Sequence, residues 1–547
     1  MSTDDLLPID ETPADSLPPN PAYEKLKKIR ARTDLEARHS PLLRESFTGF
    51  DGVSRPLKLR YYQVQGVMHL LAMKRFLLGD DTGLGKTLQS ISALCYLWER
   101  APDQKVLILT SKSSVEQWAG EFRKFTVGVT PFVARGTPVQ RKKIRDAFWA
   151  ATGPTVLVMG YRTAVQDFAD LQDQEGYVLI TDEAAAYKNH ETQVHQVCKY
   201  LSSKADRTWA LTATLIKNNL IEGWGVYGVV VPGLFGSRNH FLNEFCITRM
   251  QVLPGTRRQV PVIVGYRQRD IEEFRKKIDP YFLGRPKFEV ASELPPLVTR
   301  HVKVGMTKLQ ESKYQEALEG LLLVGEKTGQ TEEKEVTKLT AVTYCQQIVN
   351  HPELIGVDGE SEKLDALLEL ITDGELDGEK VIVFTRFRKM VDIIVPALKK
   401  RGVRAVRITG EEDEKERKAS QDAFQDPKSD ARVVAITTAA AEAINLQAAK
   451  ALIFYDTPWS AGDYLQILGR MIRIGSTHDR CYAIHLVAEG TIDDRVVKVL
   501  TKKMGLVESV LGKRIKGETD TGVTVDATND LSDLFAELIS DARARHK

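Results

Sequence analysis

Apolar residues gather in short runs along the chain from about residue 57, and most runs are followed by a segment with helical spacing. One set of runs covers residues 106–110, 155–159, 177–181 and 209–212. A second set covers residues 380–385, 404–408, 432–437, 451–455 and 481–487. Runs that are apolar on both faces are typical of parallel strands covered by helices. The alternation therefore predicts an α/β fold with parallel sheets.

The two sets of runs are separated by a region of different character. Residues 213–290 have weaker strand signals, residues 307–353 have helical spacing, and Leu294-Pro295-Pro296 is a stiff, extended break. The simplest interpretation is two α/β lobes in tandem with helical insertions. The predicted divisions are an N-terminal extension at 1–50, a first lobe at 51–292, an inter-lobe linker and helical insertion at 293–360, a second lobe at 361–512 and a tail at 513–547.

Composition narrows the class of protein. The chain has 547 residues, 42% hydrophobic and 27% charged, which is typical of a soluble globular protein and excludes a largely disordered or fibrous chain. The net charge is only +2, so any basic surface must be local. Five well-separated cysteines predict buried thiols in a reducing compartment.

The N-terminal residues differ from the rest. Residues 1–22 are acidic and rich in proline, which predicts a disordered tail and does not resemble a signal peptide. Residues 24–38 are basic, either as a solvated helical face or as a nuclear-localisation or DNA-binding patch. The most apolar stretch, residues 226–235, is too short and too broken to span a membrane.

A glycine-rich loop supplies the first candidate chemistry. It follows the apolar run at 76–78 and precedes a helical stretch at 88–97, which is the order that a phosphate-binding loop requires. Lys86 would reach the β- and γ-phosphates, and the Thr87 hydroxyl would bind Mg²⁺. The predicted nucleotide-binding residues of the loop are Asp80, Asp81, Thr82, Gly83, Leu84, Gly85, Lys86 and Thr87. Asp80 replaces the first glycine of the usual pattern, so the loop alone leaves an ordinary glycine-rich turn as the alternative.

Two carboxylates supply the second candidate. The predicted strand at 177–181 runs into Asp182 and Glu183. Asp182 would hold Mg²⁺, and Glu183 would polarise the attacking water. An isolated Asp-Glu pair is more often a solvated strand end, but a pair in the same lobe as the loop predicts a nucleoside triphosphate site.

Together with these motifs, the chain resembles the Swi/Snf-type ATPases of helicase superfamily two over about residues 57–512. The resemblance rests on segments in the family's order, with Gln63 in the adenine-side position and Asp80 where the family often has it. These segments are 59–67, 79–87, 107–122, 182–185, 211–219, 282–285 with 294–296, 350–354 with 362–364, 380–387, 466–475 and 490–495.

The resemblance implies two RecA-like lobes with ATP and Mg²⁺ in the cleft between them. It also implies that the lobes bind double-stranded DNA mostly independently of its sequence. It implies that Gln63 and Gln466 face the nucleotide, and that Arg470 and Arg473 neutralise transition-state charge. These arginines are three apart and would share a helix face. Thr212 and Thr214 would couple hydrolysis to motion. The implied DNA contacts are Ser111, Lys112, Thr385, Arg386, Thr437 and Thr438, with ordinary strand-end capping as the alternative for each.

The sequence departs from the family pattern in three places. Ala185 stands where the family usually has histidine, Leu215 where it has proline, and alanines with Glu442 occupy 439–443, where it favours glycine. Each extra Cβ restricts backbone approach, so either this loop stays helical or DNA coupling weakens.

The leading hypothesis is an ATP-dependent translocase on duplex DNA. One rival is a strand-separating or branch-migrating DNA helicase in repair or recombination. The other is a non-catalytic DNA-binding scaffold whose coupling motifs have decayed. Trp118 is interpreted as core rather than as a base-stacking platform. The compact size favours a bacterial or phage-encoded protein in the cytoplasm, or a nuclear one if the host is eukaryotic.

Overall fold

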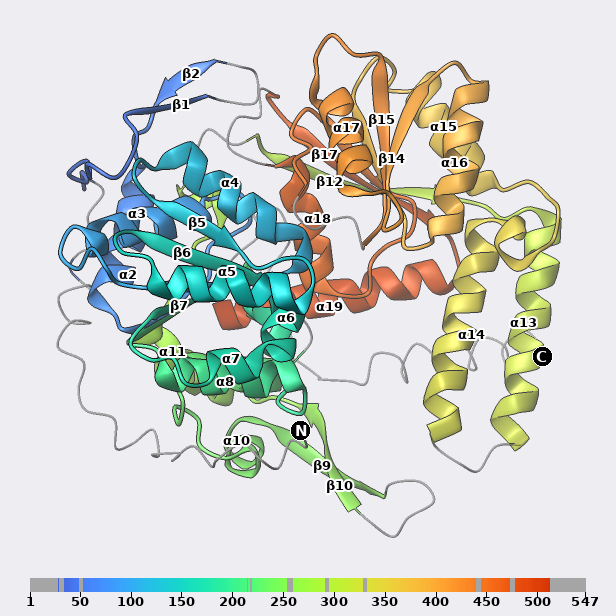
Figure 1. The fold of residues 1–547 in the computed structure, drawn as a ribbon. Coiled ribbons are helices and arrows are strands. Elements are labelled where there is room, and N and C mark those ends of the chain that lie inside the picture. Colours follow the sequence, from blue (N-terminus) through green and yellow to red (C-terminus); the bar gives the residue numbers. More distant parts are fainter. Residues whose placement is uncertain are drawn as a thin grey trace. The chain divides into compact units, whose positions relative to one another are not determined.

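The computed structural model describes residues 28, 34–48, 53–213, 215–216, 219–252, 259–290, 295–327, 332–438, 444–472 and 478–511. The chain separates into two compact units. The first contains Met1–Phe245, Arg269–Ser292 and Ser509–Lys516, and the second contains Cys246–Gln268, Glu293–Glu508 and Gly517–Lys547. We call them the first and second lobes, and each holds one large sheet (Figure 1).

The sheet of the first lobe has seven parallel strands in the order β11-β3-β8-β7-β4-β6-β5. The strands are β3 (Arg75–Leu78), β4 (Val106–Thr110), β5 (Thr130–Val133), β6 (Thr155–Gly160), β7 (Val178–Asp182), β8 (Arg207–Leu211) and β11 (Phe282–Leu283). The central strands β4, β6 and β7 are apolar on both faces because helices cover both, as their continuous hydrophobic runs predict.

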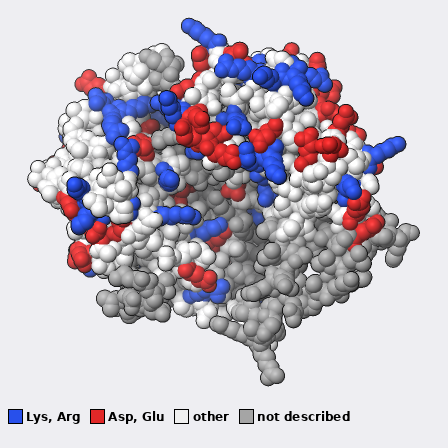
Figure 2. All heavy atoms as spheres, turned by 45° about the vertical axis from the view of Figure 1, so that its right-hand side comes forward, with Lys and Arg blue, Asp and Glu red and all other residues white. Residues whose placement is uncertain are grey.

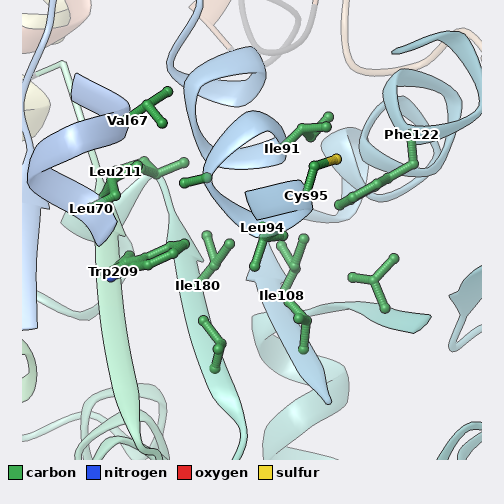
Figure 3. Close-up of a cluster of buried hydrophobic side chains, with 14 of the residues drawn as sticks. Val67, Leu70, Ile91, Leu94, Cys95, Ile108, Phe122, Ile180, Trp209 and Leu211 are labelled. Atoms are coloured by element: carbon green, nitrogen blue, oxygen red, sulfur yellow. The ribbon is translucent and has the colours of Figure 1, made fainter. Parts of the chain in front are cut away.

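Helices α2 (Tyr61–Ala72), α3 (Lys86–Trp98) and α4 (Val115–Phe125) share one apolar core with these strands. Figure 3 shows side chains of α3 turned toward the sheet, among them Leu94 near Ile108 and Ile180. The remaining helices of this part of the chain are α5 (Pro138–Ala150), α6 (Tyr161–Gln166), α7 (Phe168–Leu171), α8 (Gln193–Lys204), α9 (Leu220–Val230), α10 (Arg238–Phe245), α11 (Gln268–Ile278) and α12 (Lys287–Val290), with short 3₁₀ turns η3 (Lys112–Ser114), η4 (Ala184–Tyr187) and η5 (Asp279–Tyr281).

The sheet of the second lobe has six parallel strands in the order β12-β17-β16-β13-β15-β14. The strands are β12 (Leu297–Val304), β13 (Val381–Phe384), β14 (Arg404–Ile408), β15 (Ala431–Ile436), β16 (Ala451–Phe454) and β17 (Cys481–Ala488). The helices are α13 (Lys308–Lys327), α14 (Glu332–Asn350), α15 (Glu362–Thr372), α16 (Arg388–Lys400), α17 (Glu414–Gln425), α18 (Ala461–Met471) and α19 (Ile492–Leu511), with the 3₁₀ turn η6 (Pro352–Ile355).

Two small antiparallel hairpins complete the described strands. One joins β1 (Ser46–Thr48) to β2 (Ser54–Pro56), and the other joins β9 (Ile247–Val252) to β10 (Gln259–Gly265). Neither belongs to a large sheet.

The α/β class with two parallel sheets is confirmed, and the nine predicted strands appear within two residues of their expected bounds. In the two large sheets, β5, β11 and β12 were not predicted, and neither were the hairpin strands β1, β2, β9 and β10. β11 has only two residues, and β12, an edge strand, has three consecutive exposed polar residues at 299–301 in place of a continuous apolar run. β12 lies within 293–360, where the sequence shows only a linker and helices, and pairs with β17 over its whole length.

Several sequence expectations fall outside the described residues: the tail at 1–22, most of the basic stretch at 24–38, the alanine-rich segment at 439–443 and the tail at 513–547. Within the described part, all five cysteines are free and buried, as predicted. Among the helices of that part, none is both long enough and apolar enough to cross a membrane.

Candidate nucleotide and metal site

The glycine-rich loop lies between β3 and α3 in the first lobe. Gly83 and Gly85 have positive φ angles of 92° and 78°, a conformation in which side chains other than glycine are strained. A Cβ on Gly85 would stand 2.6 Å from Nε2 of Gln63. The glycines therefore keep the backbone open in front of the α3 N-terminus, where backbone amides and the helix dipole favour phosphate.

Lys86 begins α3 and is half-buried. Its Nζ donates to the carbonyl oxygens of Asp80, at 2.7 Å, and Asp81, at 3.4 Å. The ammonium is thus held against the loop that phosphates would occupy. Thr87 follows in the first turn, also half-buried.

Asp80 is fully buried and binds protein groups. Arg285 donates from Nε to Oδ1 at 2.9 Å and from Nη2 to Oδ2 at 2.6 Å. Gln89 donates to the same Oδ2 at 3.0 Å. The Asp80 side chain therefore anchors the loop from behind, whereas the sequence placed it at the nucleotide.

Arg285 reaches Asp80 because β11 pairs with β3 directly before the loop. Gly79 donates its N–H to Leu283 O at 2.7 Å, and Asp81 donates its N–H to Arg285 O at 3.1 Å. The sequence singled out 282–285 only as part of the family resemblance. Arg285 and Asp80 are 205 positions apart, and the pairing of β11 with β3 brings them together. No local pattern in the sequence predicts that pairing.

Gln63 on α2 is also tied to the loop. Its Nε2 donates to Leu84 O at 3.3 Å, and its Oε1 accepts the N–H of Arg60 at 2.9 Å. Leu84 is buried, while Asp81, Thr82 and Gly83 are half-buried. Gln63 therefore stands beside the loop, where its role at the adenine remains a prediction.

Asp182 ends β7, and three donors hold its carboxylate while a fourth holds its backbone oxygen. Oδ2 accepts the indole N–H of Trp118 at 2.8 Å and the hydroxyl of Thr110 at 3.2 Å. Oδ1 accepts the N–H of Glu183 at 3.0 Å. The Tyr161 hydroxyl donates to the backbone oxygen of Asp182 at 2.6 Å. The side chain and its backbone are both fixed.

The electrostatics of Asp182 show two opposing influences. Burial, and then the neighbouring Glu183, raise the pKa of Asp182 to about 6, while the Trp118 hydrogen bond, the Lys86 charge and Thr110 lower it. Leu78, directly before the loop, and Asp182 both pair with Leu211 of β8, so the loop and the carboxylates lie at the same edge of the sheet. The two sequence-predicted motifs thus form one site.

Glu183 is the one residue other than glycine with positive φ (54°) in the part of the chain that the structure describes. Such a conformation costs of order 1 kcal/mol and persists where the surroundings enforce it, often at active sites. It turns the chain sharply after β7 and leaves the Glu183 side chain half-buried beside Asp182.

The residues present fit a magnesium–nucleotide complex. Mg²⁺ prefers hard oxygen ligands with few protein donors, which a threonine hydroxyl and a carboxylate supply. The glycine backbone that a Cβ would fill matches a phosphate cradle.

The predicted coupling residues divide between described and undescribed positions. Thr212 follows β8, is buried and donates its N–H to Leu78 O at 3.2 Å, directly before the loop. Thr214 lies outside the described residues.

In the second lobe, Gln466 and Arg470 lie four residues apart on α18, so they share a face of the helix. Gln466 is half-buried, and Arg470 is buried. That Arg470 and Arg473 share a helix face stays a prediction. α18 ends at Met471, Ile472 is extended, and Arg473 lies outside the described residues.

The first predicted DNA segment is accessible. Lys112 is exposed, and Ser111 is half-buried with its hydroxyl bonded to Ser113 and Ser114. After β15, Thr437 is buried and Thr438 exposed.

Thr385 and Arg386 are engaged inside the second lobe. The Thr385 hydroxyl donates to the buried carboxylate of Asp456. The Arg386 guanidinium lies 4.0 Å from the Trp459 ring centroid and donates to Gln346 at 2.7 Å. Burial lowers the pKa of Arg386 and raises that of Asp456. These contacts match the structural alternative, and a DNA role for either side chain remains a prediction.

Comparison with known proteins bears on the whole arrangement. The family model of the SNF2-related domain matches residues 62–354, more than half of the chain, and that of the helicase conserved C-terminal domain matches residues 362–475. The chain belongs to the SNF2-related family. The family matches thus include the loop, Asp182, Glu183 and α18.

Similar curated proteins include the ISWI chromatin-remodeling complex ATPase ISW2 of Saccharomyces cerevisiae, 28% identical over 83% of this chain and 41% of its own. The ATP-dependent DNA helicase DDM1 of Arabidopsis thaliana is 27% identical over 83% of this chain and 62% of its own. The chain thus spans about two-fifths to three-fifths of the length of these relatives. They come from a yeast and a plant and do not support the expected bacterial or phage origin.

A solved structure is also similar, the Sulfolobus solfataricus SWI2/SNF2 ATPase core in complex with dsDNA. It is 25% identical, with a TM-score of 0.40, covering 89% of this chain and 97% of that chain.

Proposed function

We propose that the chain hydrolyses ATP with Mg²⁺ and uses the energy to move along double-stranded DNA. The observation that carries this proposal is that Lys86 on the loop and the Asp182–Glu183 pair lie at the same edge of the sheet in the first lobe. The family assignment and the relatives' names, as ATPases of chromatin-remodeling complexes and an ATP-dependent DNA helicase, support it.

Each residue has a role in the proposed reaction. The loop amides and Lys86 bind the β- and γ-phosphates, and Thr87 and Asp182 hold Mg²⁺. The metal ion neutralises phosphate charge when bound. Glu183 accepts a proton from the water that attacks the γ-phosphorus, while the bond from that phosphorus to the ADP oxygen breaks.

The second lobe supplies cations in this proposal. Arg470 and Arg473 stabilise the charge on the leaving phosphates, with Gln466 at the nucleotide. Arginines in such positions contribute on the order of 10³–10⁵ in rate. Because they belong to another lobe, hydrolysis would depend on lobe closure, and DNA would act by favouring closure.

The decisive experiment measures ATP hydrolysis by the full chain alone and with duplex DNA, single-stranded DNA or RNA. We expect duplex DNA to stimulate most. Glu183→Gln should lower kcat by about 10²–10⁴ while ATP still binds, because only the proton acceptor is lost. Glu191→Gln, at an exposed position nearby, is the matched control and should hydrolyse at the wild-type rate.

Translocation needs its own readout. Displacement of a triplex strand without separation of the duplex would support a translocase. Displacement of a duplex strand would instead indicate a strand-separating helicase. ATP binding without hydrolysis on any nucleic acid would contradict the proposal and favour the non-catalytic scaffold.

A further inference from the structure

The indole of Trp118 contacts the carboxylate that the proposed function assigns to Mg²⁺. Its Nε1–H donates to Oδ2 of Asp182 at 2.8 Å. Trp118 lies on α4 and Asp182 at the end of β7, 64 positions apart, so only the tertiary fold creates this bond. No role in the reaction has so far been given to this side chain.

The position of the Trp118 N–H is set by the hydrophobic core. The side chain is 2% exposed, and its ring centroid lies 6.2 Å from that of Phe122. An indole has one donor and no acceptor, and its N–H direction is fixed once the ring is packed. A core residue thus presents a rigid donor to Asp182.

A rigid donor matters because a magnesium ligand must be ionised and correctly oriented. Hydrogen bonds from neutral donors to a carboxylate favour its charged form, which burial disfavours. The Trp118 and Thr110 side chains both donate to Oδ2, whereas Oδ1 accepts the backbone N–H of the adjacent Glu183. The two carboxylate oxygens of Asp182 therefore differ: two side-chain donors fix Oδ2 in place, and Oδ1 is bonded to the adjacent backbone N–H.

We propose that Trp118 is a positioning residue that holds Asp182, through its indole N–H, in the orientation that binds Mg²⁺. This inference rests on the proposed function, since it assumes a magnesium–nucleotide complex at the site. The bond also joins the metal ligand to α4, the helix that directly follows the predicted DNA residues Ser111 and Lys112. Partners of this kind typically contribute 10- to 100-fold in metal affinity.

The test measures nucleotide binding rather than turnover. Fluorescent mant-ADP is titrated into the full chain in EDTA and in increasing MgCl₂. Trp118→Phe keeps an aromatic ring and removes the N–H. We expect its half-saturating Mg²⁺ concentration to rise 10- to 100-fold, with the affinity in EDTA within about twofold of wild type, because only the metal-dependent part uses Asp182.

Trp98→Phe is the matched control. Trp98 is 1% exposed, its ring centroid lies 6.4 Å from that of Phe122, and its indole donates to Gln104 O at 2.8 Å. This variant removes the same atoms and an equivalent hydrogen bond from the same core, away from Asp182. Its Mg²⁺ dependence should match wild type.

The outcomes separate the two proposals. If Mg²⁺ does not change nucleotide affinity in the wild type, the proposed function fails. If it does, but Trp118→Phe and Trp98→Phe behave alike, the role of Trp118 is overturned and the proposed function stands. If Trp118→Phe does not fold, benzothienylalanine at position 118 keeps the bicyclic shape without an N–H. Wild-type Mg²⁺ dependence in that variant would equally overturn the inference.

Discussion

At the scale of single residues, the site in the first lobe combines one buried ion pair with charged side chains that are half-buried. Asp80 and Arg285 form a buried ion pair that anchors the loop. The Asp182 carboxylate accepts hydrogen bonds from Trp118 and Thr110. A buried ion pair contributes little compared with an apolar pair, but removal of one partner leaves an uncompensated charge. The first pair therefore fixes geometry more than it adds stability.

Removal of one partner of the Asp80–Arg285 ion pair should destabilise the fold strongly. Arg285→Met should lower the free energy of unfolding by about 3–5 kcal/mol, because the Asp80 charge stays buried without its partner. The double variant Asp80→Asn with Arg285→Met should recover much of the loss. Urea titration followed by circular dichroism measures both.

An exposed ion pair serves as the control for Arg285. Arg300 contacts Glu375 at 2.6 Å with both side chains about two-fifths exposed. Arg300→Met should cost less than about 1 kcal/mol. Equal losses for the two arginines would contradict the structural role of Arg285.

A buried histidine should make the first lobe sensitive to acid. Burial lowers the pKa of His195 to about 4, although the bond to Tyr187 O opposes it. In the unfolded chain the imidazole takes up a proton near its ordinary pKa of about 6.5. Stability from this group is therefore full above pH 6.5 and is lost as pH falls toward 4.

The His195→Gln variant tests whether stability falls with pH in this direction. Its melting temperature should lie below wild type at pH 7.5, where the neutral histidine packs well, and the difference should narrow by pH 5. The exposed His240→Gln should show no such narrowing. A constant difference across this pH range would contradict the prediction.

At the scale of elements, close backbone contacts position the segments after the motifs. The turn η4 follows Glu183, and Lys188 at its end lies against α9, where a Cβ on Gly225 would stand 1.9 Å from Lys188 O. Only glycine allows this approach. The helix is accordingly near the sharp turn that presents Glu183.

Two glycine substitutions in helices should act in opposite directions. Gly225→Ala should lower the melting temperature, since backbone atoms must move to accept the methyl group. Gly120→Ala on α4 meets no atom within 4 Å and should raise stability by up to about 1 kcal/mol through helix propensity. Differential scanning calorimetry compares them, and destabilisation by both would show that helix packing is tighter than the contacts indicate.

At the scale of the whole molecule, charge is almost balanced. The chain carries 76 basic and 74 acidic side chains, and Figure 2 shows the two interspersed over the described residues of the face that it draws. Binding of duplex DNA would then depend on a few local contacts rather than on the net field. Among the predicted DNA contacts, the Lys112 side chain is exposed, whereas the Arg386 guanidinium contacts Trp459 and Gln346 within its own lobe.

Lys112 should therefore account for a measurable part of the salt dependence. Lys112→Ala should reduce the slope of log affinity for duplex DNA against log salt concentration by about 0.9, as expected for one phosphate contact. Lys143→Ala, at an exposed position on α5, is the control and should leave the slope unchanged. Fluorescence anisotropy at several salt concentrations gives both slopes, and identical slopes for wild type and Lys112→Ala would remove this residue from the interface.

The sequence by itself determined the parallel sheets, the glycine-rich loop and the Asp182–Glu183 pair. These features depend on patterns within a few residues, because burial on both faces and a positive φ restrict which side chains a short segment accepts. The tertiary structure decided which distant side chains and strands contact them. β11 adds to β3, Arg285 anchors Asp80, Trp118 holds Asp182, and Thr385 and Arg386 face into their own lobe. Such partners lie tens to hundreds of positions apart, and the packing of whole layers, rather than any local pattern, selects which of them meet.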